Sequence, residues 1–249
     1  GEYLSRIQKL MPLCLTSFTG GSKDNAIPRS CQATVVAMGI GIERINDVAA
    51  QLQAEIREKF DEPEASIQAF DVDALGGNSL TTAATSDVIS LLCACPNGVQ
   101  SYSQDIPGLV QTSLNLGIAK LGDRFTATFS VRSSVNQEKE ELIRKLRELT
   151  DFYNGTYTQS GTYPAWEFRK DSPLRDTMVR IYQEMFGKEP QVLAIHAGLE
   201  CGLLGDKLPG LDCVSIGPQM HDIHTSREKL EIASTERTWN FLLEVLKNL

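Results

Sequence analysis

The chain of 249 residues is long enough for one large domain or two ordinary ones, and it can bury a sizeable hydrophobic core. Its 41% hydrophobic and 22% charged residues are typical of a soluble globular protein. A formal net charge of −8 argues against a general surface for nucleic acid or anionic membrane, and no apolar run approaches the roughly 20 residues that span a bilayer.

The six cysteines form no Cys-x-x-Cys pair and show no regular spacing. Several lie in apolar or strand-like runs, where a free cysteine behaves as a small hydrophobic residue. This usage is typical of a reducing compartment. The sequence therefore predicts a cytoplasmic protein without a disulfide framework.

Hydrophobic periodicity over residues 1–161 predicts a self-contained domain of mixed helices and strands. In chain order its predicted elements are a helix (1–11), two strands (12–19 and 31–38), a helix (42–60), a short strand (67–72), a helix (80–94), two alternating strands (114–118 and 125–131), a helix (134–149) and a strand (155–160). This order suggests an α+β sandwich of the ferredoxin-like type.

The pattern changes in residues 162–249. A helix is predicted at 173–186, and a final helix is predicted to be capped by Ser234. Between them lie two short apolar strands, Gln191–Ile195 and Cys213–Ile216, whose following loops carry all three histidines. In open α/β sheets, ligand sites gather at the carboxyl ends of the strands. The fold class predicted for the whole chain is therefore α/β (α+β).

The histidines are candidates for a metal site. His221 and His224 are three positions apart, and His196 lies 25 residues before His221. Histidine is the commonest metal ligand, but this spacing is not a recognised ligand motif. From spacing alone, two loop histidines and a pair of metal ligands both remain open.

Other polar residues also have two interpretations each. Arg132, at the end of a predicted strand, is a surface charge or a guanidinium placed to bind a carboxylate through two hydrogen bonds. Asn25, three residues before Pro28, is by itself most typical of a turn. Gly198 and Glu200 lie in a glycine-rich stretch that suits close approach of a ligand to the backbone, although Glu200 could equally be a solvated acid.

Several stretches together resemble one family, and these are Asn25–Arg29, Pro96–Val99, Thr112–Asn115, Tyr163-Pro164-x-Trp166, Ile195–Leu203 and Val214–Pro218 with His224 six residues further on. In these stretches the chain resembles the cytosolic aminoacyl-histidine dipeptidases (Xaa-His dipeptidases). These are bacterial di-zinc metallopeptidases related to aminoacylases and carboxypeptidases. The matches run in order over essentially the whole chain.

The resemblance implies an architecture. Residues 1–161 would form a lid and dimerisation domain without its N-terminal strand, and residues 162–249 the C-terminal segment of a zinc-peptidase α/β catalytic domain. The remaining zinc ligands and the general base would lie upstream of residue 1, so no catalytic residue is expected in this chain. In the intact enzyme two zinc ions, or other divalent ions, would activate a water molecule that hydrolyses carnosine-like Xaa-His dipeptides. This chain alone is expected to be inactive.

The resemblance also assigns residues. His224 matches a zinc ligand of the family, whereas His221 falls at a variable position. Arg132 matches an arginine that binds the C-terminal carboxylate of the dipeptide, and Asn25 matches an asparagine near the substrate. Gly198 and Glu200 match the loop that lines the substrate pocket. Thr225-Ser226 stands where the family usually has Ser-Pro.

The expected partners are a small dipeptide and a second copy of the chain, bound through the lid, with no nucleic acid and no membrane. Two alternatives remain at this stage. One is a non-catalytic lid module that acts in dimerisation, and the other is a related aminoacylase or tripeptidase.

Overall fold

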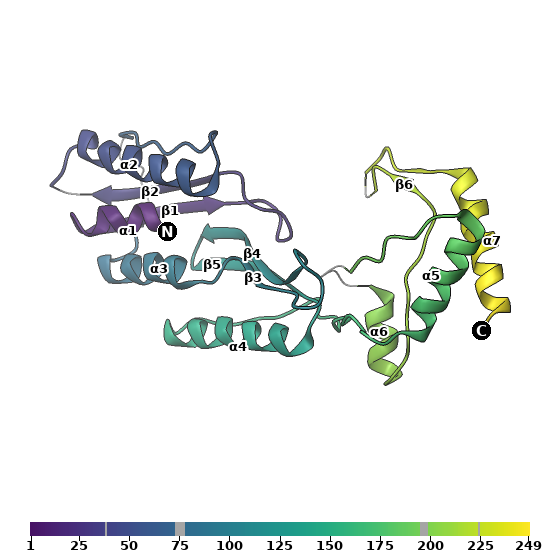
Figure 1. Cartoon of the computed structure of the whole chain (residues 1–249). Helices are drawn as coiled ribbons and strands as arrows, with labels where there is room; N and C mark the ends of the chain where they lie inside the picture. The colour runs from purple at the N-terminus through teal and green to yellow at the C-terminus, as the bar shows by residue number, and fades with distance from the viewer. Residues whose placement is uncertain (38, 73–77, 195–198, 224) are drawn as a thin grey trace. The chain divides into compact units, whose positions relative to one another are not determined.

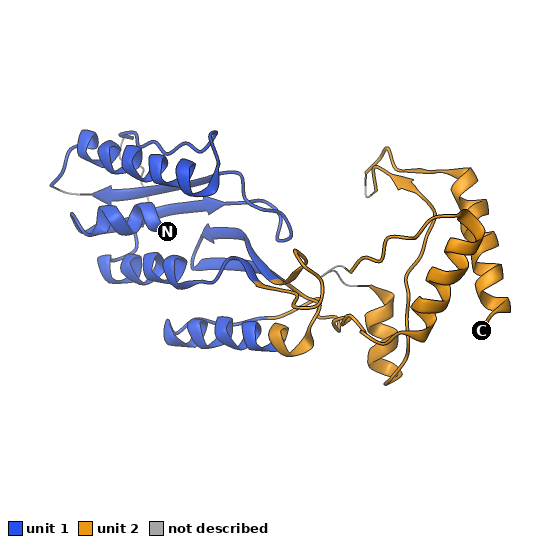
Figure 2. Cartoon of the chain, viewed as in Figure 1, with its two compact units in different colours: residues 1–100, 113–131, 140–158 blue, residues 101–112, 132–139, 159–249 orange. Residues whose placement is uncertain are grey.

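The computed structural model describes residues 1–37, 39–72, 78–194, 199–223 and 225–249 (Figure 1). The chain divides into two compact units (Figure 2). Unit 1 comprises residues 1–100, 113–131 and 140–158, and unit 2 comprises residues 101–112, 132–139 and 159–249. Among the described helices, none is long and apolar enough to cross a membrane.

The described elements mix helices with antiparallel strands, which confirms the predicted α/β class. In chain order they are α1 (Glu2–Gln8), β1 (Leu13–Gly20), β2 (Cys31–Ala37), α2 (Ile42–Phe60), α3 (Thr82–Ala94), β3 (Gly98–Tyr102), β4 (Val110–Leu121), β5 (Phe125–Ser133), α4 (Asn136–Phe152), α5 (Pro173–Phe186), α6 (Glu200–Lys207), β6 (Met220–His221), β7 (Lys229–Leu230) and α7 (Ile232–Lys247).

The main sheet has the strand order β2-β1-β4-β3, and β5 also pairs with β4. β1 is antiparallel to β2 from Leu13, opposite Ala37, to Gly20, opposite Cys31. Strand β1 alternates between buried and more exposed side chains at its start, which is the pattern of a sheet with one face on a core.

The core of unit 1 lies between this sheet and the helices. Its most deeply buried side chains include Leu13 and Leu15 of β1 and Ile89 of α3, together with apolar side chains of α1 and α2. The fully buried hydroxyl of Thr85, in α3, accepts a hydrogen bond from the backbone N–H of Leu15 at 2.9 Å. A buried polar group therefore has a partner here, as burial requires.

A second cluster joins α4 to the sheet. Leu142 and Leu146 of α4 pack with Leu114 of β4, and the partly buried Phe129 and Tyr157 cover the cluster. These leucines, four positions apart, place one face of α4 against the sheet.

Two short strands predicted within residues 1–161 are absent. The segment around Ile67 and Ala69 has no strand beside it, because α2 satisfies its backbone instead. Gln53 accepts from the N–H of Ile67 at 2.9 Å, and the Asn46 amide bonds both the N–H and the C=O of Ala69. Residues 155–160 likewise form no strand. The structure instead has β3, which the sequence patterns did not predict.

In unit 2, α5 packs against α7. Met178 and Ile181 of α5 and Phe241 and Val245 of α7 form the core, and the ring of Tyr182 meets Phe241 edge-on at 5.5 Å. The boundaries of α5 follow from its sequence: Ser172 caps the first turn through the N–H of Arg175, and Gly187 ends the helix in the left-handed conformation.

Three predictions in unit 2 were wrong. Neither Gln191–Ala194, the described part of the first predicted strand, nor Cys213–Ile216 forms a strand. Apolar sequence alone makes no strand, because each strand needs a neighbour for its backbone hydrogen bonds, and no backbone hydrogen bond found between described residues involves either segment. Ser234 does not cap α7 either. It lies inside the helix, where its hydroxyl donates to Glu231 and accepts from the N–H of Gln219.

Candidate functional site

Arg132 is the second-last residue of strand β5. It precedes Ser133, a buried residue whose hydroxyl shares a 2.7 Å hydrogen bond with Thr112 and accepts from the N–H of Val135 at 3.0 Å. The guanidinium of Arg132 has no hydrogen-bond or ion-pair partner among the described residues, and the side chain is half-buried. An arginine with a fixed backbone and unused donors can bind an incoming carboxylate.

The carboxylate of Glu138, in the first turn of α4, holds the backbone next to Arg132 through hydrogen bonds to β3 and β4. Glu138 accepts hydrogen bonds from Ser101 and Gln111, each at 2.5 Å, and also from Thr112. Burial works to raise the pKa of Glu138, but the hydrogen bonds from these three side chains outweigh it and lower the pKa below its ordinary value. Glu138 therefore stays ionised and ties β3 and β4 to α4 next to Arg132.

Asn25 lies exposed in the loop between β1 and β2, in unit 1. The side-chain amide of Asn115, in β4, donates to the carbonyls on both sides of Asn25, those of Asp24 at 3.3 Å and Ala26 at 2.7 Å. The backbone of Gly117 passes so close that a Cβ there would lie 2.2 Å from the carbonyl oxygen of Asp24. The loop is therefore held against β4 by the hydrogen bonds of Asn115 and by close packing on the backbone of Gly117.

Glu200 is the first residue of α6 and is exposed. A carboxylate in a first helical turn interacts favourably with the helix dipole, so local structure already accounts for this acid. The neighbouring Gly202 is buried because its backbone packs on unit 2 itself. A Cβ there would lie 2.8 Å from the carbonyl oxygen of Pro164, so the glycine-rich stretch serves close packing at this point.

The loop with the last histidines forms a hairpin. His221 is exposed in β6 and pairs with Lys229 of β7. Thr225 orders the turn between them, since its N–H and hydroxyl both donate to the carbonyl of Asp222. The predicted site residues His224 and Gly198 lie outside the described residues, as does His196.

Apart from the undescribed positions 38, 73–77, 195–198 and 224, no three histidine, cysteine, aspartate or glutamate side chains converge on a point that could hold a metal ion. A catalytic zinc ion takes three protein ligands. The donors of the described residues therefore do not fit a zinc centre by themselves.

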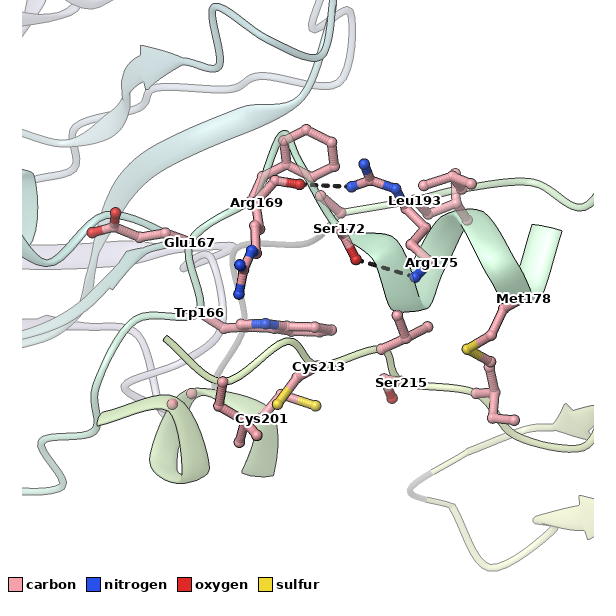
Figure 3. A pocket seen from close by; sticks show the side chains of 18 of the residues that line it. Trp166, Glu167, Arg169, Ser172, Arg175, Met178, Leu193, Cys201, Cys213 and Ser215 are labelled. Carbon is pink, nitrogen blue, oxygen red and sulfur yellow. Dashed lines mark hydrogen bonds between the residues drawn. The ribbon is translucent and has the colours of Figure 1, made fainter. Parts of the chain in front are cut away.

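A cavity of about 600 Å³ opens in unit 2 (Figure 3). Its wall includes Trp166, the first turn of α5, the two extended segments Gln191–Ala194 and Cys213–Ile216, and the thiol of Cys201. The size suits a small molecule, but much of the wall is backbone without partners among the described residues.

The two arginines of this cavity are already engaged. Arg175 donates to the carbonyls of Arg169 and Lys170, at 2.7 and 2.5 Å, and stacks on the ring of Phe168. Arg169 donates to the carbonyls of Asp171 and Gly210, and Figure 3 shows Arg169 and Arg175 beside Ser172. These guanidinium groups hold the turn before α5 and are not free for a ligand.

Asp212 fastens one extended segment to α5. Its carboxylate accepts from the hydroxyl of Ser172 at 2.7 Å and from the N–H of Leu174 at 3.0 Å. Burial works to raise the pKa of Asp212, but these two hydrogen bonds, with Arg169 and Arg175 nearby, outweigh it and lower the pKa.

This depressed pKa predicts a pH dependence of stability. The contribution of Asp212 is complete above the unfolded pKa of about 3.9 and is lost as the pH falls through the lower folded pKa. We expect Asp212→Asn to lower the free energy of unfolding at pH 7 by about 1 kcal/mol, because a helix-capping acceptor is lost. The deficit should shrink below pH 4. Urea titrations at several pH values measure it, with the exposed Asp206→Asn as control; an equal deficit at pH 2.5 and pH 7 would contradict the prediction.

Three site residues went unnoticed in the sequence patterns: Asn115, Glu138 and Asp212. Asn115 lies within one of the matching stretches and could have been singled out there. Glu138 and Asp212 had no such signal, because each gains its meaning from partners far along the chain.

The chain was compared with protein families, with known sequences and with solved structures. No protein-family model matches the chain. Over its whole length the chain is similar to proteins named as dipeptidases. It is 32% identical to the cytosol non-specific dipeptidase of Escherichia coli over 251 aligned residues. Its structure is similar to that of the aminoacylhistidine dipeptidase of Vibrio alginolyticus, with a TM-score of 0.88 and 27% identity over 99% of this chain. The chain spans about half the length of each, 52%.

A more distant structural match is the aminopeptidase PepT of Bacillus cereus, with a TM-score of 0.52 and 12% identity over 94% of this chain and 51% of that one. This likeness concerns the fold alone. The resemblance to the aminoacyl-histidine dipeptidases that the motifs predicted is confirmed by the two nearer relatives.

Proposed function

We propose that this chain takes part in the hydrolysis of Xaa-His dipeptides in a zinc-dependent, cytoplasmic dipeptidase. The observation that carries the proposal is the match along the whole chain to two proteins named as dipeptidases. The boundary between a lid at 1–161 and a catalytic segment at 162–249 is part of the proposal. When zinc is bound, it would polarise the scissile carbonyl and activate water, and His224 would supply one of its ligands.

The residues of this chain serve substrate binding in this proposal. Arg132 binds the C-terminal carboxylate of the dipeptide, because its guanidinium lacks a partner among the described residues and its backbone is fixed by Ser133 and Glu138. Asn25, Gly198 and Glu200 line the substrate site. The segments Gln191–Ala194 and Cys213–Ile216, which have no backbone partner among the described residues, would pair with strands that correspond to the other half of the relatives.

The carboxylate contact can be tested in a chimera in which this chain replaces the matching residues of the E. coli dipeptidase. We expect Arg132→Ala to raise KM for a free Xaa-His dipeptide by about 10- to 100-fold with kcat little changed, since a charged hydrogen-bonded pair contributes about 1.5–3 kcal/mol. The exposed Arg124→Ala serves as control. The C-terminal amide of the same dipeptide should show almost no difference between wild type and Arg132→Ala.

A loss that is equal for acid and amide would contradict this role. If the chimera does not fold, chemical-shift titration of the isolated chain with the acid and the amide gives the same comparison. Rates with Xaa-His peptides, other dipeptides, acylated amino acids and tripeptides separate the proposed activity from that of an aminoacylase or tripeptidase.

A non-catalytic role in dimerisation is the second candidate, and one observation favours a dimer. β2 lies at an edge of the main sheet, with most of its side chains exposed, and an edge strand can pair with another chain. We propose a homodimer formed through unit 1. Light scattering during size-exclusion chromatography measures the mass, and a monomer at high micromolar concentration would rule the dimer out.

A further inference from the structure

Two thiols meet in the wall of the unit 2 cavity. Cys201 lies in the first turn of α6, and Cys213 follows Asp212 in an extended segment. Their side chains converge in Figure 3, and Cys213 lies close enough to contribute to the raised pKa of the Cys201 thiol. Both residues line the cavity and both are half-exposed, so a small molecule can reach the pair.

The two backbones are held in place independently of the thiols. Gly202, next to Cys201, packs on the carbonyl of Pro164, and Asp212, next to Cys213, is bound by Ser172 and by the N–H of Leu174. Each thiol therefore has a neighbour fixed by other interactions. The pairing of the sulfurs is a property of the fold of unit 2.

We infer that Cys201 and Cys213 form a redox-active dithiol, which a low-molecular-weight disulfide such as oxidised glutathione converts into an intramolecular disulfide. The inference does not depend on the proposed peptidase activity. It identifies a modification site in a chain whose sequence shows no disulfide framework.

The reaction balances as two thiol–disulfide exchanges. One protein thiolate attacks a sulfur of the glutathione disulfide, whose S–S bond breaks and releases one glutathione thiolate. The second protein thiolate then attacks the protein sulfur of this mixed disulfide and releases the other glutathione. The protein thiols lose two protons and two electrons in all, and one glutathione disulfide becomes two glutathione thiols.

The environment of the pair affects the rate. Burial raises the pKa of the Cys201 thiol, and the adjacent Cys213 and Glu200 raise it further. Since the thiolate is the attacking species, oxidation should accelerate between pH 7 and pH 9. The disulfide would join α6 to the segment that leads into the β6–β7 hairpin, and so reshape the cavity.

Peptide mapping of the oxidised chain tests the inference directly. After treatment with oxidised glutathione and alkylation of the remaining thiols, trypsin places Cys201 in peptide 189–207 and Cys213 in peptide 208–227. We expect a disulfide-linked pair of these two peptides by mass spectrometry, reversed by dithiothreitol. The thiol titre in denaturant should fall by two from the six of the sequence.

Variants and the unfolded chain give the controls. Cys213→Ser should abolish the linked peptides, whereas Cys93→Ser, which removes an exposed thiol of unit 1, should keep them. Oxidation in guanidinium chloride should lose the preference for this pair, because the fold no longer holds the sulfurs together. The inference is overturned if native oxidation yields only glutathione adducts, or if other cysteine pairs form as readily as this one.

Discussion

The 249-residue chain by itself is expected to bind zinc no more tightly than at high micromolar concentration and to show no turnover of carnosine. His224 is the single zinc ligand that the family resemblance assigns, and a catalytic zinc site takes three protein ligands. Among the residues that the structure describes, no three donors converge to complete the set. Isothermal titration with zinc and a carnosine hydrolysis assay measure the two quantities.

Variants identify any zinc that does bind. Weak binding that disappears in Cys213→Ser but persists in His224→Ala would be held by the dithiol, because thiolates are good zinc ligands. Weak binding that depends on His224 would support its role as a ligand. Stoichiometric, tight binding accompanied by turnover would show that the chain carries a complete site, and the prediction would then be wrong.

Replacement of Gly117 by alanine is expected to destabilise unit 1 by roughly 3 kcal/mol, since the added methyl group has no room. Its Cβ would lie 2.2 Å from the carbonyl oxygen of Asp24 and 2.6 Å from two further backbone atoms of that residue. Backbone cannot rotate away as a flexible side chain can. The loop that carries Asn25 must therefore move away from β4.

Two measurements separate local from global effects of Gly117→Ala. Urea unfolding gives the change in stability, and limited trypsin digestion reports the loop, which contains Lys23 and Arg29. We expect cleavage at these residues to accelerate at least about tenfold, which corresponds to about 1.4 kcal/mol of easier local opening.

Gly122→Ala is the matched control for this substitution. It adds the same methyl group in the turn between β4 and β5, where nothing lies within 4 Å of the new Cβ. Its unfolding and its digestion should match the wild type. Equal behaviour of Gly117→Ala and Gly122→Ala would show that the close approach of Gly117 to Asp24 does not hold the loop.

The two predictions concern different parts of the proposed dipeptide site. Zinc binding tests how much of the proposed metal centre this chain supplies, while Gly117 tests how the loop around Asn25 is positioned. Neither residue set was visible as a cluster in the sequence, where Asp24 and Gly117 are far apart.

Local sequence signals were sufficient for the long elements. The apolar periodicity of 42–60 coincides with α2, and Ser172, Pro173 and Gly187 set both ends of α5 through capping geometry that acts within a few residues. The motif around Asn25, with the other matching stretches, also indicated the related dipeptidases, and through that resemblance Arg132 was assigned. Such signals work because helix periodicity, caps and turns depend on neighbours in the chain.

Tertiary structure decided the rest, because the missing information lay in distant partners. The apolar segments Gln191–Ala194 and Cys213–Ile216 look like strands, yet no neighbour among the described residues completes their hydrogen bonds. Ser234 looks like a cap, but its hydroxyl is used inside α7. The pairing of Cys201 with Cys213 appears only in the fold, since α6 and the segment after Asp212 must come together before either thiol has a partner.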